Sequence, residues 1–405
     1  MRIALVAQHA TPLRPRAGAG PDNDDIGLSE LTRVLANHGH QVTVYAQKQR
    51  PELPDHAELH RGVRVEHLDA GPVPARGAQG DADLLERVPA FSGPLRSRFH
   101  RERPDVVHAL RWTSGLAALA AARDLGIPVV QEFSSLGVTE RRERTERRDR
   151  VKADGAAAAR IRLEPAIGRT AAAVVATHSA EVSDLASLGG HRSAIRVVPW
   201  GVDTDTFTPA GPAAKRNGRP RLLTAADLRE RAALETLLRA LTRVPAAELL
   251  VVGGPARAEL PNDDAYVGLA RFAGMLGISD RVIFTGKVEH NAMPALLRSA
   301  DLVVSTCQYE PSGTTSLQAM ACGTPVIAPP VGGHMDAVVD GTTGILIPPS
   351  RPALLAQRIR QLLAHPMLVE AYGVAAADRA KSRYSWDRIA GETLAVYDTA
   401  TAQAA

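Results

Sequence analysis

Short, continuous apolar runs alternate with helical patterns along almost the whole chain, and this alternation constrains the fold more than any other feature. In the first half the runs cover residues 2–7, 41–45, 63–67, 106–109, 128–133 and 173–176, with helical patterns such as 26–38 and 115–125 between them. Strands that are apolar without interruption are typical of a sheet covered by helices on both faces, the usual setting of parallel strands. The pattern therefore predicts a parallel α/β sheet.

The second half of the chain repeats this pattern. Apolar runs at 221–224, 248–253, 282–285, 302–305, 325–328 and 344–347 alternate with helical patterns such as 233–241 and 294–297. Proline and glycine are concentrated between 198 and 220, which indicates a linker. A chain of 405 residues has room for two domains. We expect two doubly wound parallel sheets, one in an N-terminal domain over 1–200 and one in a C-terminal domain over 201–385. We expect the final helix and tail, 386–405, to cross back to the N-terminal domain.

Composition excludes several classes of protein. Lysine and arginine number 48 against 44 acidic residues, and this small excess suits an anionic ligand but is too weak to indicate nucleic acid. Two cysteines without a Cys-x-x-Cys motif exclude a disulfide framework and a cysteine zinc site, and favour a reducing cytoplasm. The apolar stretch after Met1 is too short for a signal peptide, and no stretch approaches the roughly 20 apolar residues of a membrane span.

Three polar segments interrupt the pattern. Residues 14–25 and 71–80 are rich in glycine, proline and other small or acidic residues, and we expect them to be loops. Residues 141–150 form a run of mixed charge. Such a run is usually the solvated face of a helix, and the alternative is a basic surface for a phosphorylated acceptor or a membrane.

The stretch 305–325 is the most informative for function. Ligands of open α/β sheets bind outside the carboxyl ends of the strands, and here a predicted strand ends at Ser305 and is followed by Glu310. A Gly-Thr-Thr-Ser turn that begins at Gly313 then opens a helix. The N–H groups and positive end of such a helix suit a phosphate, and glycine lets the ligand approach the backbone closely. The same residues also fit a simple capped strand-to-helix turn.

The order of motifs along the chain favours the functional interpretation. The relevant segments are 1–7, 35–44, 105–108, 125–128, 197–207, 305–325, 331–336 and 341–349. Together they resemble family 4 of the nucleotide-sugar glycosyltransferases, the large retaining family that includes sucrose synthase-like and mycothiol-type enzymes. The resemblance covers nearly the whole chain and implies the GT-B fold, in which two Rossmann-like domains face each other across a cleft. It also implies a nucleoside-diphosphate sugar bound mainly by the C-terminal domain, a small-molecule acceptor against the N-terminal domain, retention of the anomeric configuration, and neither metal nor cofactor.

The resemblance assigns donor-site roles to several residues. It places Glu310 at a hydroxyl of the donor sugar, as a catalytic residue. Gln318 stands where the family has its second glutamate. Its amide can still form hydrogen bonds with ribose hydroxyls, but these bonds lack the extra strength that a charged carboxylate gives. The remaining residues implied for the donor are the amides of Gly313, Thr314 and Thr315, and the base-binding positions Gly254, Lys287 and Val288.

Other positions depart from the family pattern. Asp227 and Ala232 stand where the family has the arginine and lysine that neutralise the diphosphate, and Arg229 and Arg231 are the nearby candidates to replace them, unless they are ordinary surface residues. In the N-terminal domain Asp22 and Asn23, just after Gly20, replace the family's Gly-Gly in the loop for acceptor and phosphate. Ser134 replaces the family's catalytic histidine, Gln131 stands where another histidine is common, and His108 is either a second catalytic candidate or a satisfied strand-end histidine.

These substitutions favour an unusual acceptor. A thiol ionises more readily than an alcohol near neutral pH, so it needs less help from a catalytic base. We therefore expect a transferase of secondary metabolism, such as antibiotic biosynthesis, that acts on a small molecule and possesses no nucleic-acid partner. A non-catalytic nucleotide-sugar-binding protein and a nucleotide-sugar 2-epimerase are the alternatives, and the oligomeric state is not predicted.

Overall fold

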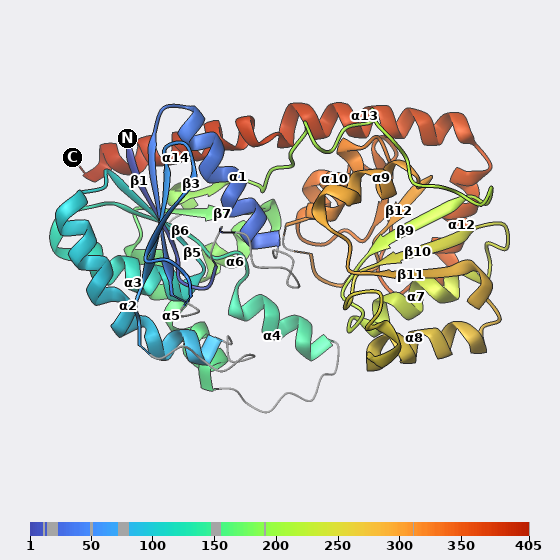
Figure 1. The fold of residues 1–405 in the computed structure, drawn as a ribbon, viewed down its shortest axis with the longest axis horizontal. Helices are drawn as coiled ribbons and strands as arrows, with labels where there is room; N and C mark the ends of the chain where they lie inside the picture. The colour runs from blue at the N-terminus through green and yellow to red at the C-terminus, as the bar shows by residue number, and fades with distance from the viewer. Residues whose placement is uncertain are drawn as a thin grey trace. The chain divides into compact units, whose positions relative to one another are not determined.

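The computed structural model divides the chain into two compact units (Figure 1). Unit 1 comprises Met1–Trp200 together with Trp386–Ala405, and unit 2 comprises Gly201–Ser385. The chain therefore leaves unit 1 after Trp200 and returns to it at Trp386. The structure describes residues 1–10, 13, 23–48, 52–71, 81–146, 155–189, 192–310 and 312–404.

Unit 1 contains a sheet of eight described strands in the order β3-β4-β2-β1-β5-β6-β7-β8. The strands are β1 (Arg2–Ala7), β2 (Gln41–Gln47), β3 (His56–His60), β4 (Val63–Leu68), β5 (Val106–Leu110), β6 (Val129–Glu132), β7 (Ala173–Ala176) and β8 (Ile195–Val197). The pairs are parallel except that β3 runs antiparallel to β4. Strand order reverses beside β1, which lies between β2 and β5.

Helices cover both faces of the unit 1 sheet. Alternate residues of β1 show the two layers: Ile3 and Leu5 pack with α1 (Asn23–Asn37) and α14 (Trp386–Ala404), whereas Val6 packs with α2 (Asp81–Glu102) and α3 (Trp112–Ala122). The other helices of this unit are α4 (Gly137–Glu146), α5 (Gly155–Thr170) and α6 (Ser179–Ser187). Burial on both faces explains why the strands are continuously apolar.

Unit 2 contains a parallel sheet of six strands in the order β11-β10-β9-β12-β13-β14. The strands are β9 (Arg221–Ala225), β10 (Glu248–Val252), β11 (Val282–Gly286), β12 (Leu302–Val304), β13 (Val326–Ala328) and β14 (Gly344–Leu346). Numbered within the unit, this is the order 3-2-1-4-5-6 of the dinucleotide-binding Rossmann sheet.

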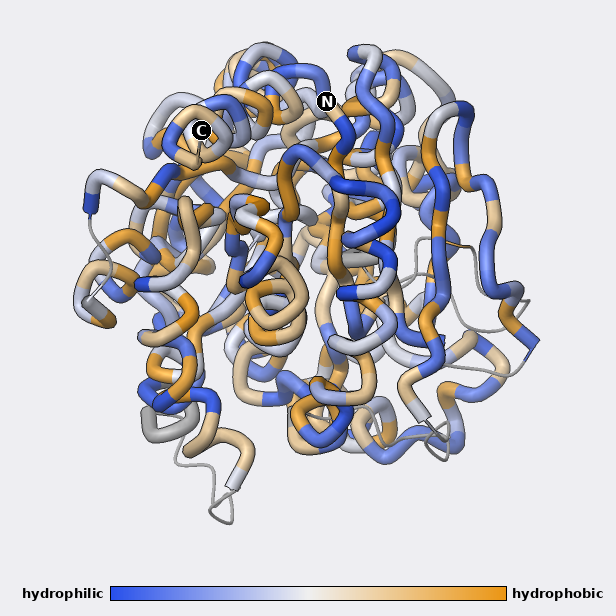
Figure 2. The backbone as a smooth tube through the Cα atoms, turned by 90° about the vertical axis from the view of Figure 1, so that its left-hand side faces the viewer, coloured by the Kyte–Doolittle hydropathy of each residue, from blue (hydrophilic) through white to orange (hydrophobic). Residues whose placement is uncertain are grey.

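Two helix layers enclose this second sheet as well. One face packs against α7 (Arg231–Leu241), α8 (Asp264–Met275) and α12 (Pro352–Leu363), and the other against α9 (Met293–Arg298), α10 (Thr314–Ala321) and α13 (Pro366–Tyr384). In β12, Leu302 and Val304 face the first layer and Val303 faces the second. Figure 2 shows apolar and hydrophilic stretches following one another along the described parts of the chain that face the viewer.

The predicted fold class is confirmed, with one correction. Every predicted apolar run overlaps a strand, but β3 is antiparallel, so the first sheet is not purely parallel. The sequence analysis missed β3 because it is a partly exposed edge strand with charged and polar residues. It missed β8 because that strand is also at the sheet edge, and two of its three residues, Arg196 and Val197, are exposed. Of the predicted loop 14–25, only 23–25 are described, and they begin α1; of 71–80 only Gly71 is described. Residues 141–146 of the mixed-charge run belong to α4.

Candidate functional site

In a doubly wound sheet, ligands bind outside the carboxyl ends of the strands where strand order reverses. In unit 2 this point lies between β9 and β12. The loop after β9 carries Asp227 and Arg229, and the loop after β12 carries Glu310. The topology therefore brings together at one sheet edge the two segments singled out in the sequence.

Glu310 is held by the turn that starts α10. Its Oε1 accepts hydrogen bonds from the backbone N–H of Gly313, at 2.9 Å, and from the hydroxyl of Ser312, at 3.1 Å. The Ser312 hydroxyl also accepts a bond from the hydroxyl of Thr314, at 2.8 Å. A carboxylate has acceptor positions beyond these two bonds, so Glu310 can accept a further hydrogen bond from a ligand hydroxyl.

Two glycine-containing loops lock this turn in place. Gly313 has a φ of +66°, a left-handed conformation that favours glycine at the start of the helix. A Cβ on Gly333 would lie only 2.7 Å from the carbonyl carbon of Ser312, so a larger residue there would push the two loops apart. The N–H of Gly333 also donates to the carbonyl of Glu310, at 2.9 Å. The orientation of Glu310 thus depends on both loops.

Burial raises the pKa of the Glu310 carboxyl above its ordinary value, and the hydrogen bonds from Gly313 and Ser312 partly oppose that shift. A desolvated carboxylate forms stronger hydrogen bonds than one in water. The turn therefore presents a strong, oriented hydrogen-bond acceptor.

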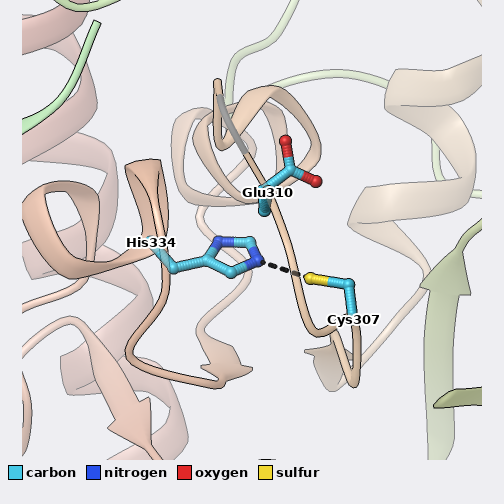
Figure 3. A group of neighbouring side chains, drawn as sticks. All are labelled: Cys307, Glu310 and His334. Carbon is cyan, nitrogen blue, oxygen red and sulfur yellow. Dashed lines mark hydrogen bonds between the residues drawn. The ribbon is translucent and has the colours of Figure 1, made fainter. Parts of the chain in front are cut away.

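Two residues that the sequence analysis did not select lie beside Glu310: Cys307 and His334 (Figure 3). The His334 Nε2 is 3.5 Å from the Cys307 Sγ, and its Nδ1 is 3.0 Å from the hydroxyl oxygen of Ser316 in α10. Burial lowers the pKa of His334 to about 4, and burial together with the charge of Glu310 raises the pKa of the Cys307 thiol to about 12. The sequence did contain a signal for them: Cys307 follows the predicted strand β12 and His334 follows β13, and the carboxyl ends of parallel strands meet at the same edge of the sheet.

The basic residues proposed for the diphosphate are paired locally. Arg229 forms a two-pronged ion pair with Asp227, with Nε 3.0 Å and Nη2 2.7 Å from the Asp227 Oδ2. Arg231 pairs with Glu235, at 2.7 Å. Both arginines are exposed, and the Arg229 side chain is 85% accessible. The charge of Asp227, which stands where the family has an arginine, is thereby neutralised by Arg229, the residue predicted to replace that arginine.

The other predicted donor residues either follow strand ends or lie in α10 of the same unit. Gly254 follows β10 with a φ of +86°, and a Cβ there would lie 2.5 Å from the Leu228 side chain. Lys287 and Val288 follow β11, and the N–H of Lys287 donates to the carbonyl of Pro255, at 2.9 Å. Thr315 and Gln318 lie in α10, where Gln318 is buried. Local acceptors already take the N–H groups of Gly313 and Thr314.

The predicted catalytic residues of unit 1 lie in a different environment. His108 is the third of five residues in β5, not a strand-end residue, and is only 1% exposed. Its Nδ1 lies 2.8 Å from the hydroxyl of Tyr397 in α14, and its Nε2 lies 3.7 Å from the Glu132 Oε2. Burial lowers the pKa of His108 to about 4. The expectation of a strand-end position is therefore wrong, because β5 continues beyond His108 to Leu110.

Ser134 follows β6 and has a φ of +60°, which is unusual for a residue other than glycine. Its hydroxyl lies 3.5 Å from the Glu132 Oε1, and Glu132 also accepts a bond from the indole N–H of Trp200, at 3.0 Å. Gln131 is buried and donates to the carbonyls of Arg111 and Glu132. Gly20 and Asp22 lie outside the described residues, and Asn23 is the first residue of α1.

Comparisons with known proteins cover both units. Residues 210–379 match the family model described as glycosyl transferases group 1, and residues 27–201 match the glycosyl transferase 4-like domain. A D-inositol 3-phosphate glycosyltransferase of Frankia alni is 33% identical over 98% of this chain and 99% of its own. D-inositol 3-phosphate glycosyltransferase 2 of Catenulispora acidiphila is 30% identical over 98% of this chain and 94% of its own.

Solved structures agree with these matches. Sucrose-phosphate synthase from Thermosynechococcus elongatus has a TM-score of 0.84 and 27% identity, with 99% of each chain covered. The Anabaena protein HepE in complex with UDP-glucose has a TM-score of 0.71 with 98% of this chain and 99% of its own covered, and at 19% identity that likeness bears on the fold alone. No helix among the described residues is long and apolar enough to cross a membrane.

Proposed function

This chain belongs to the family 4 glycosyltransferases of GT-B fold, which use nucleotide sugars, and from that premise we propose that it transfers a sugar to a small-molecule acceptor with retention of the anomeric configuration and without a metal ion. The relatives that match over nearly the whole chain are named as glycosyltransferases, which favours transfer over mere binding or 2-epimerisation. We place the reaction in the cytoplasm and in secondary metabolism, and we assign the donor to unit 2 and the acceptor to unit 1.

The observation that carries the proposal is the way Glu310 is held at the start of α10. Two protein donors fix one of its oxygens, and burial strengthens its remaining hydrogen-bonding capacity. In our proposal Glu310 accepts a hydrogen bond from a hydroxyl of the donor sugar. It orients the sugar as the anomeric carbon gains positive charge in the transition state.

The departing diphosphate gains negative charge in the same step, so preorganised donors around it supply much of the catalysis. The first turn of α10 offers N–H groups and the positive end of a helix dipole. Since Gly313 and Thr314 already donate to local acceptors, we assign the phosphate contacts to the N–H of Thr315 and to the exposed cations Lys287 and Arg229. Gly254 and Val288 line the route to the base, and Gln318 binds the ribose.

The acceptor decides how much base catalysis the enzyme needs. Ser134 is a poor general base, and His108 is buried under α14 with a pKa lowered to about 4. A thiol acceptor, or one whose own phosphate takes up the proton, reduces that need. Since the relatives are named D-inositol 3-phosphate glycosyltransferases, a phosphorylated polyol is the acceptor to test against a thiol.

The test is acceptor-dependent release of nucleoside diphosphate by the purified full-length chain. Uridine, guanosine, adenosine and thymidine diphosphate sugars are each incubated with D-inositol 3-phosphate, inositol or low-molecular-weight thiols, in the presence of a chelator. We expect turnover with one donor and product of unchanged anomeric configuration by NMR. Donor hydrolysis or 2-epimerisation without acceptor, an inverted product, or a strict need for a divalent metal would contradict the proposal.

A further inference from the structure

Cys307, Glu310 and His334 form a cluster of side chains with metal-binding atoms beside the donor turn. Cys307 and Glu310 come from the loop after β12, and His334 comes from α11 (Gly333–Ala337), after β13. The Sγ of Cys307, the Nε2 of His334 and a carboxylate oxygen of Glu310 all lie within 4.8 Å of one another. Figure 3 shows the imidazole and the thiol facing each other, with the carboxylate above them. Segments far apart in sequence thus bring a sulfur, a nitrogen and an oxygen ligand together.

The distances suit a tetrahedral zinc ion. Zinc binds sulfur at about 2.3 Å and nitrogen at about 2.0 Å, which at a tetrahedral angle separates the two ligand atoms by about 3.5 Å. The observed distance between the Cys307 Sγ and the His334 Nε2 is 3.5 Å. The Ser305 hydroxyl lies 3.1 Å from that sulfur and 3.3 Å from that nitrogen, so it borders the same face. The third ligand atom, a carboxylate oxygen of Glu310, lies within 4.8 Å of both, so the carboxylate must move closer to them when the ion binds.

The surroundings hold the imidazole as metal sites usually do. A ligating histidine generally has its second ring nitrogen hydrogen-bonded, which fixes the tautomer and the ring orientation. Here the Nδ1 of His334 lies 3.0 Å from the Ser316 hydroxyl, and Ser316 is itself buried in α10. A mixed sulfur, nitrogen and carboxylate set favours zinc over magnesium or calcium, which prefer oxygen.

We infer that Cys307, His334 and Glu310 bind a Zn²⁺ ion, and that bound zinc withdraws Glu310 from the donor sugar and stops transfer. On binding, a zinc–sulfur bond forms and the thiol proton leaves to solvent, with no change of oxidation state. The thiolate and the carboxylate together neutralise the charge of the ion. The fourth coordination position is left to water or to Ser305. The inhibitory part of this inference rests on the function proposed above for Glu310, whereas the binding part does not.

Binding is tested on the full-length chain without substrate. Protein freed of metal with a chelator and desalted is titrated with Co²⁺, whose thiolate complexes absorb in the near ultraviolet, and the cobalt is then displaced with Zn²⁺. We expect one equivalent of cobalt with a thiolate band. Cys307→Ala should abolish the band, whereas Cys322→Ala, which removes the other cysteine of the sequence, buried in the same unit, should keep it.

Quantitative competition with a zinc chelator ranks the remaining ligands. His334→Gln should weaken zinc binding by about 100-fold or more, and Ser316→Ala by about 10-fold because it acts through the imidazole. The inference is overturned if the unaltered protein shows no thiolate band, or if Cys307→Ala and Cys322→Ala bind cobalt equally. The direct titration of the unaltered protein decides the matter even if a variant fails to fold.

Inhibition is then tested in the acceptor-dependent assay. Stoichiometric zinc should abolish turnover of the unaltered protein, chelator should restore it, and Cys307→Ala should show the same rate with and without zinc. Turnover unaffected by zinc in protein that carries the thiolate band would overturn the inhibitory part. Absence of turnover in chelator instead counts against the proposed function, while the cobalt titration still reports on the site.

Discussion

Each unit contains a buried histidine close to a carboxylate, at the end of a strand in unit 1 and in the loop after a strand in unit 2, but the neighbours of the two clusters differ. In unit 1, His108 contacts Tyr397 of α14, and Glu132 accepts the indole N–H of Trp200. In unit 2, His334 contacts Cys307 and Ser316, and Glu310 accepts the backbone N–H of Gly313. Burial lowers the pKa of both histidines to about 4.

The difference lies in what the partners are attached to. In the first cluster the partners are two large aromatic side chains, Tyr397 of α14 and Trp200, the last residue before the chain leaves unit 1. This cluster therefore joins packed elements to one another. The partners of the second are small residues and backbone groups of loops at the topological switch point. The same residue types thus join packed elements in one unit, and in the other they surround the carboxylate that we propose binds the donor sugar.

The largest expected effect is a loss of kcat that distinguishes Glu310 from Glu132. Glu310→Gln should lower kcat by about 100- to 1000-fold, since it removes the charged hydrogen-bond acceptor that we propose binds the donor sugar. Its affinity for the nucleoside diphosphate should change little. The matched variant Glu132→Gln should instead lower stability and leave kcat within about threefold, because the hydrogen bond from Trp200 is structural. Steady-state kinetics with calorimetric titration of the nucleotide checks both, and equal losses of kcat would remove the distinction.

Acid should destabilise both units. Each histidine is neutral when folded, with a pKa of about 4, whereas in the unfolded chain its pKa is about 6.5. The unfolded state therefore binds more protons in this window, and stability falls as pH falls from about 6.5 towards 4, by about 3 kcal/mol for each histidine at most.

Tryptophan fluorescence distinguishes the two contributions. The three tryptophans, Trp112, Trp200 and Trp386, all lie in unit 1, so their fluorescence reports its unfolding, whereas circular dichroism reports both units. His108→Gln should reduce the acid sensitivity of the fluorescence transition in urea, and His334→Gln should leave that transition alone. A fluorescence transition that keeps its full pH dependence in His108→Gln would refute the assignment.

A packing change should perturb the first cluster alone. A Cβ on Gly27 of α1 would lie 1.7 Å from the Trp200 ring, so Gly27→Ala must displace the indole that bonds to Glu132. We expect a loss of about 1–3 kcal/mol in the free energy of unfolding of unit 1. Gly391→Ala in α14 is the control, because outside the neighbouring residues and backbone of its own helix no heavy atom lies within 4 Å of the new Cβ. It should be neutral or stabilising by up to about 1 kcal/mol. Equal melting temperatures for the two variants would contradict this account.

The smallest expected effect concerns the surface arginines. Asp227→Asn releases Arg229 from its ion pair and should tighten binding of the nucleoside diphosphate about two- to fivefold, since an exposed pair is worth at most about 1 kcal/mol. Combined replacement of Arg229 and Arg231 by alanine should weaken binding by a similar factor. Glu235→Gln, which releases Arg231, is the comparison, and titration calorimetry at low salt is the measurement. If Asp227→Asn instead weakened binding of the nucleoside diphosphate, the Asp227 carboxylate and not Arg229 would be the group that contacts it.

Much of the fold was predictable because strand signals are local. The continuous apolar runs at β1 and β7 have the predicted bounds, and the turn from Glu310 to Gly313 could be recognised from a glycine and a carboxylate a few residues apart. The polar edge strand β3 could not, because its pairing with β4 rather than its composition makes it a strand.

By itself, the sequence determined the two doubly wound sheets, the family resemblance and the Glu310 turn, since each depends on the order and spacing of nearby residues. Only the tertiary structure decided the surroundings of the reactive side chains. Tyr397 reaches His108 across 289 positions, and His334 reaches Cys307 across 27, because the strands return to one edge and α14 folds back onto the first sheet. Burial and hydrogen-bond partners set the chemistry of a histidine or a carboxylate, and both are properties of distant segments that pack together.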